Sequence, residues 1–106
     1  MSEPTPEQER QQKLAVVGIG IEAERFITSP LGRYIVNRAE QERERALEAL
    51  VKADPHEVAQ VQQLQNAVKV IDAVQQWIAD AITEGAAMEQ SLVAEDVEAG
   101  GGPPSA

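Results

Sequence analysis

The stretch from Val58 to Ile82, VAQVQQLQNAVKVIDAVQQWIADAI, decides the fold. Its apolar residues recur at alternating steps of three and four, interrupted only at Gln75, which is the period of an amphipathic α-helix. A first stripe contains Val61, Leu64, Val68, Ile71, Ile78 and Ile82. A second stripe beside it contains Ala67, Val70, Val74, Trp77 and Ala81. One buried face needs only the first stripe, so the two together predict contact with two neighbours.

Three helix-start signals of one type divide the rest of the chain. Thr5-Pro6, Ser29-Pro30 and Asp54-Pro55 each join a capping side chain to a proline at the first helical position. Gln8 and Glu57 stand where a capping box would place them.

These signals predict helices over residues 6–28, 30–53 and 55–84, with Gly85 as the C-terminal cap of the third. Since only Asp54 separates the second helix from the third, they are expected to form an antiparallel hairpin with a very tight corner.

The first segment is ambiguous because residues 14–21, LAVVGIGI, are β-branched and contain two glycines. A strand here would need a partner strand, and no other segment resembles one. The sequence therefore predicts an all-α fold, with 6–28 as either one helix or two pieces joined by a kink near the glycines.

Charge and composition exclude several classes of protein. The chain of 106 residues has 18 acids and 9 bases, a net charge of −9, and residues 70–106 contain no base. It has no cysteine, so it offers no disulfide framework or thiolate metal site. The polar start is not typical of a secretory signal, no apolar run is long enough to cross a membrane, and the acidic surface disfavours nucleic acid.

We expect a flexible N-terminus over residues 1–4, a single helical domain over 5–93, and a disordered acidic tail over 94–106. The tail contains three consecutive glycines and two prolines, which do not propagate a helix.

Residues 18–23 match the dinucleotide-binding pattern G-x-G-x-x-A. That function needs a βαβ unit and an acidic residue about 20 positions further on. Glu40 and Glu42 have the spacing, but they lie in a strongly helical run. Gly18 and Gly20 are better explained by the close approach of another helix.

The other reactive residues also favour structural roles. His56 has no partner at a metal-ligand spacing and is expected at the solvent-exposed start of a helix. The pairs Glu40 and Glu44, and Asp72 and Asp80, lack a nucleophile or histidine beside them. We therefore expect no enzyme activity, no catalytic residue, no cofactor and no metal.

The basic residues Arg33, Arg38, Arg43 and Arg45 alternate with glutamates, so we expect a solvated face held by ion pairs. The spacing predicts the pairs Arg38–Glu42, Glu40–Arg43 and Glu42–Arg45.

Trp77 is the only tryptophan, and it is either the anchor of the core or a hot spot of an interface. Three helices of this kind bury little apolar surface within one chain, and small domains commonly gain the missing stability by association with a second copy. We therefore expect a homo-oligomer, a dimer by preference, assembled as an intermolecular bundle. Its interface is expected to contain Val61, Leu64, Val68, Ile71, Val74, Trp77, Ile78 and Ile82.

Residues 24–90 resemble a group of small acidic helical proteins from tailed bacteriophages and prophages. The resemblance rests on Phe26, Ser29-Pro30-Leu31-Gly32-Arg33-Tyr34-Ile35, Arg38-Ala39-Glu40, Leu50, Asp54-Pro55, Leu64-Gln65-Asn66, Trp77-Ile78 and Glu84-Gly85. It implies a role in virion assembly or structure, in the cytoplasm of a bacterial host and then in the particle. It supplies no catalytic residues.

Two functions follow as hypotheses. The first is a non-enzymatic assembly protein that acts by contact with itself and with another phage or host protein. The alternative is an inhibitor of a host or defence protein, whose carboxylates imitate nucleic acid and occupy a basic groove.

Overall fold

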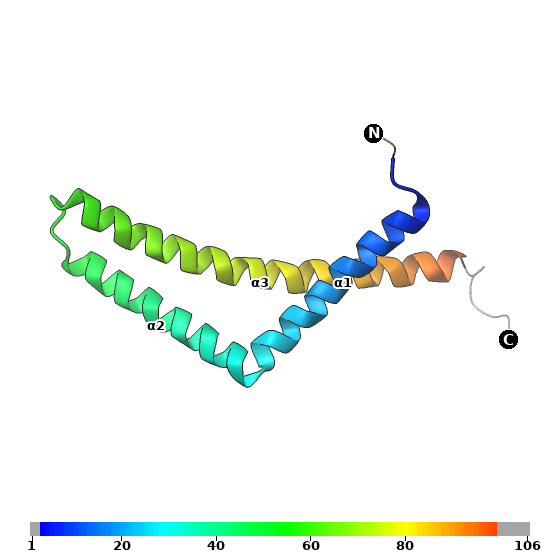
Figure 1. The fold of residues 1–106 in the computed structure, drawn as a ribbon, viewed down its shortest axis with the longest axis horizontal. Coiled ribbons are helices and arrows are strands. Elements are labelled where there is room, and N and C mark those ends of the chain that lie inside the picture. Colours follow the sequence, from blue (N-terminus) through cyan, green and yellow to red (C-terminus); the bar gives the residue numbers. More distant parts are fainter. Residues whose placement is uncertain (1–2, 100–106) are drawn as a thin grey trace. The chain divides into compact units, whose positions relative to one another are not determined.

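The computed structural model describes residues 3–99, which form three α-helices and no strand (Figure 1). The helices are α1 (Pro6–Thr28), α2 (Pro30–Lys52) and α3 (Val58–Ala99). The predicted all-α fold, with a helical hairpin and an N-terminal helix, is confirmed. The contacts of the chain form two compact units, whose described residues are 3–24 and 80–99 in the first and 25–79 in the second. The single domain expected over residues 5–93 stays a prediction.

The start of α1 is a capping box, as the sequence predicts. The backbone N–H of Gln8 donates to Thr5 Oγ1 at 3.2 Å, and the N–H of Thr5 donates to Gln8 Oε1 at 2.9 Å. The helix then continues through Gly18 and Gly20 to Thr28. Residues 6–28 are therefore one helix, with no break at the glycines.

The corner between α1 and α2 depends on Ser29 and Gly32. Ser29 Oγ accepts from the N–H of Gly32 at 3.0 Å and donates to the carbonyl oxygen of Phe26 at 2.6 Å. Gly32 is buried, and a Cβ at this position would overlap the carbonyl group of Phe26. The predicted cap at Ser29-Pro30 is confirmed, and Gly32 is the residue that lets the corner close this tightly.

The corner between α2 and α3 is longer than predicted. Residues 53–57 are not helical, and α3 begins at Val58 rather than at residue 55. Asp54 Oδ1 accepts from the N–H of His56 at 2.9 Å, and its carbonyl accepts from the N–H of Glu57 at 2.9 Å. The prediction that Asp54 caps a helix was wrong, because its side chain closes a turn instead. An aspartate before a proline can do either.

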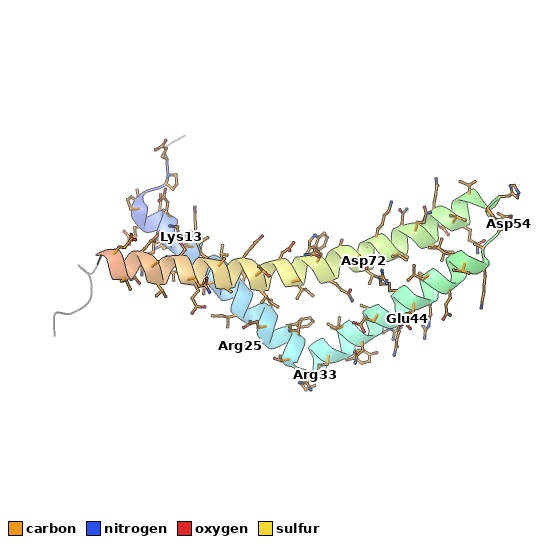
Figure 2. All side chains as sticks on the ribbon, turned by 180° about the vertical axis from the view of Figure 1, so that it is seen from behind. Lys13, Arg25, Arg33, Glu44, Asp54 and Asp72 are labelled. Atoms are coloured by element: carbon orange, nitrogen blue, oxygen red, sulfur yellow. The ribbon has the colours of Figure 1, made fainter. Side chains whose placement is uncertain are left out.

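In the second unit, α2 and the first half of α3 run antiparallel as a hairpin (Figure 1). Ala46 is the buried hydrophobic residue of this hairpin, at 7% exposure. Arg43 on α2 and Asp72 on α3 join the two helices through a 2.7 Å ion pair, and Figure 2 labels Asp72.

In the first unit, two glycines allow α1 and the last part of α3 to approach closely. A Cβ on Gly20 would lie 2.9 Å from the carbonyl oxygen of Ala81 and 2.9 Å from the Cα of Gly85. Both glycines are buried, as is Leu92 further along α3. The close helix approach expected at this pair of small residues is confirmed for Gly20, whereas nothing lies within 4 Å of a Cβ on Gly18.

Two predicted boundaries of the third helix were wrong. Gly85 does not cap a helix at residue 84, because α3 continues through it to Ala99. Since Gly85 has no side chain, its backbone can lie in close contact with Gly20. Residues 94–99, expected in a disordered tail, are the last residues of α3. The remainder of that expected tail, 100–106, lies outside the described residues, as do the first two residues.

Candidate functional site

The residues expected at an interface divide into two sets on α3. Val61, Leu64, Val68, Ile71 and Ile78 are half-buried in the second unit, and we call these five residues the inner row. Ile82 is half-buried in the first unit. Val74 and Trp77, in contrast, are exposed at 43% and 66%. The chain therefore partly buries the inner row by itself and leaves Val74 and Trp77 exposed to solvent.

Val74 and Trp77 belong to a continuous exposed stripe on α3. Ala67 and Val70 complete it, with Val70 exposed at 62%, and we call these four residues the outer stripe. At about 100° per residue, the outer stripe lies roughly a third of a turn around the helix from the inner row. The two faces predicted from the sequence are thus both present, and only one of them is partly covered.

Trp77 does not belong to the core of its own chain, since the residue is 66% exposed. Of its two expected roles, anchor of the core does not apply within the protomer. Tryptophan is enriched at the centres of protein interfaces and among their hot spots. Its role as a hot spot stays a prediction.

Helix α2 also leaves apolar side chains open. Of its apolar residues, Ala46 is buried and Ala39 and Leu50 are half-buried, but Leu31 and Ile35 are exposed. Val51 is 87% exposed at the end of the helix. The hairpin therefore buries little apolar surface relative to what it displays.

The arginines of α2 are engaged with carboxylates. Arg45 contacts Glu42 at 2.8 Å and Arg38 contacts Glu42 at 4.0 Å, as the spacing predicts. The predicted partner of Arg43 was wrong, because Arg43 Nε reaches across the hairpin to Asp72 Oδ1 instead of to Glu40. This hydrogen bond and the charge of Asp72 raise the pKa of Arg43 above its ordinary value.

In the first unit, two further ion pairs join α1 to the acidic end of α3. Lys13 Nζ lies 2.7 Å from Glu95 Oε1, and the Arg10 guanidinium donates to both oxygens of Asp96, at 3.0 and 3.3 Å (Lys13 is labelled in Figure 2). The hydrogen bonds from Arg10, and then its charge, lower the pKa of Asp96 below its ordinary value of 3.8. These pairs connect Glu95 and Asp96, which were expected in the tail, to helix α1.

We expect Arg10→Gln to raise the pKa of Asp96 back toward 3.8. Because the folded-state pKa is lowered, the pair stabilises the fold above the ordinary pKa, and this stabilisation is lost as the pH falls through the lowered value. The effect on stability should be small because both side chains are exposed. A carboxyl NMR titration measures the pKa directly, and an Asp96 pKa that is the same in both proteins would refute the pairing.

The other candidate residues of the sequence lie in the three helices and in the loop before α3. Gly18 to Ala23, the dinucleotide-like pattern, lies inside α1, with no strand in residues 3–99 to build the required βαβ unit. His56 is exposed as expected, but it lies in the loop before α3 and not at the start of the helix. Within the described part of the chain, no three His, Cys, Asp or Glu side chains come together where they could hold a metal ion. None of the helices in that part is long and apolar enough to span a membrane.

Sequence reasoning missed the residues that bring separate helices together. Gly85 was assigned to a helix end, although its pairing with Gly20 could have been suspected from the small residues on both helices. The ion pairs of Asp72, Glu95 and Asp96 join residues 29 to 86 positions apart, and no local pattern signals them.

No protein-family model, no curated protein and no solved structure matches this chain.

Proposed function

We propose that this protein is a non-enzymatic interaction and assembly protein that acts as a homo-oligomer. The observation that supports this is the balance of apolar residues in the described chain. Among residues 3–99, only Ala46 and Leu92 are buried hydrophobic residues, whereas fourteen large hydrophobic residues are exposed. Four neighbouring apolar residues of this surface form the outer stripe, and a contiguous exposed apolar patch is typical of protein–protein contacts.

The setting that we propose rests on the resemblance to small acidic phage proteins. In that setting the protein contributes to the assembly of a tailed phage particle in the cytoplasm of a bacterial host, and it remains in the virion as a minor component. Contact with a second phage or host protein would follow self-association.

The acidic end of α3 favours assembly over imitation of nucleic acid. A mimic needs carboxylates that are free to meet a basic groove. Glu95 and Asp96 are instead paired with Lys13 and Arg10 in the same unit. Since the whole chain still carries a net charge of −9, the dependence of binding on salt concentration separates the two functions.

Thermal unfolding at several protein concentrations tests the proposal. An oligomer that unfolds to single chains should show a Tm that rises with protein concentration. The rise should persist from about 0.1 M to about 1 M NaCl, because apolar contacts are not screened when the Debye length falls from about 10 Å to about 3 Å. A Tm that is independent of concentration in both salts would contradict self-assembly. Binding to a basic protein that disappears at high salt would favour the mimic.

A further inference from the structure

The spacing of the outer stripe is symmetric along the helix axis. From Ala67 to Val70 is three residues, from Val70 to Val74 is four, and from Val74 to Trp77 is three again. When an identical helix is laid against it in the opposite direction, the stripe therefore meets itself in register. The valines then face one another, and the largest side chain of each helix meets the smallest of the other.

Size complementarity favours this arrangement. Trp77 has a large side chain and is 66% exposed, so it packs best against a small residue of the partner. Ala67 is such a residue at the other end of the stripe. In a parallel arrangement, two copies of Trp77 would meet one another and two copies of Ala67 would leave a gap, which packs less well.

Charge also favours a second copy at this place. A chain with a net charge of −9 repels itself over much of its surface, so two copies need a region that is locally neutral. From Val58 to Ala79, α3 contains one base, Lys69, and one acid, Asp72. Asp72 is paired with Arg43, so no unpaired carboxylate stands on this segment.

We propose that a second copy of this chain docks on the outer stripe with α3 antiparallel to α3. Around a two-fold axis, Val70 contacts Val74 of the partner subunit, and Trp77 covers Ala67 of the partner subunit. Such an isologous contact is closed, because each copy uses the same patch. The inference rests on the proposed homo-oligomer and specifies its interface and direction.

Distances between spin labels test the direction. The chain has no cysteine, so single cysteines at the exposed polar residues Gln60 and Gln65 can each carry one nitroxide without replacing a residue of the stripe. With the two-fold axis midway between Val70 and Val74, the axial separation of the two labels should be about 36 Å at Gln60 and about 21 Å at Gln65. A parallel pair would give one similar distance at both sites.

A matched pair of variants tests the location. Val70→Glu should abolish the distance signal between labels, because it places a carboxylate in the centre of the stripe. Val51→Glu should leave the signal unchanged, since Val51 is 87% exposed on the other helix of the same hairpin. Circular dichroism of both variants should match that of the unmodified chain, since neither valine is buried.

The outcomes separate this inference from the proposed function. A dimer with equal distances at Gln60 and Gln65, or a dimer that survives Val70→Glu, would overturn the antiparallel contact while self-association stands. A chain that remains a monomer, with no distance signal at either site, would overturn both. An unrelated protein that binds the stripe while the chain alone stays monomeric would show a different occupant and would also reject the inference.

Discussion

Replacement of Gly32 by alanine is expected to destabilise the second unit by about 3 kcal/mol or more, which is the upper range for overpacking. The added Cβ would overlap the carbonyl group of Phe26 and lie 3.1 Å from the Cα of Ile27. Both obstacles are backbone, so no side chain can rotate away. The corner would have to open, and the hydrogen bond from the Gly32 N–H to Ser29 Oγ would be lost with it.

Gly18→Ala is the matched control, and its effect should have the opposite sign. Gly18 is exposed in the interior of α1 with nothing within 4 Å of a Cβ. Alanine there should stabilise the helix by about 1 kcal/mol through its better helix propensity. Chemical denaturation of both variants measures the difference. Equal stability of the two variants would mean that the α1–α2 corner is not as tight as described.

Replacement of Trp77 by alanine is expected to weaken the oligomer by about 3–5 kcal/mol, the range for removal of a buried aromatic residue. That corresponds to a dissociation constant raised at least about a hundredfold. In the separate chain, Trp77 is 66% exposed, so the protomer itself should lose little stability. Sedimentation equilibrium measures the dissociation constant.

Val51→Ala provides the comparison for this measurement. Val51 is more exposed than Trp77 and lies on α2, outside the outer stripe, so its loss should leave the dissociation constant within a few-fold of the unmodified value. If Trp77→Ala and Val51→Ala have the same small effect, the outer stripe is not an interface.

The parts of the fold that local chemistry determines could be predicted from the sequence. Thr5 and Ser29 cap their helices through hydrogen bonds that span only three residues, so the pattern around each proline is sufficient. The two apolar stripes of α3 likewise follow from the helical period alone. Because residues 58–82 are helical, the residues of each predicted stripe share one face of α3.

The errors arose where one residue type serves two purposes. Gly85 is typical of a helix end, yet a glycine inside a helix also allows a neighbour to approach, and here the contact with Gly20 decides. Asp54 before proline is typical of an N-cap, but its side chain closes the turn to His56. In each case the tertiary or loop context selected the outcome, and the residue pattern allows both.

The candidate site shows the same division. Sequence identified the residues of α3 that carry apolar surface, but it could not tell which of them the chain covers by itself. That distinction depends on how α2 lies against α3, which the Arg43–Asp72 pair helps to fix across 29 residues. Exposure of Trp77 and half-burial of Ile71 are therefore structural findings.

Light scattering coupled to size-exclusion chromatography tests most directly whether a second copy covers the apolar faces of this chain. We expect the unmodified protein to elute as a species of twice the 11.5 kDa chain mass, and to remain so at high salt. A mass of 11.5 kDa at every protein concentration, with a cooperative melting transition, would contradict the central claim.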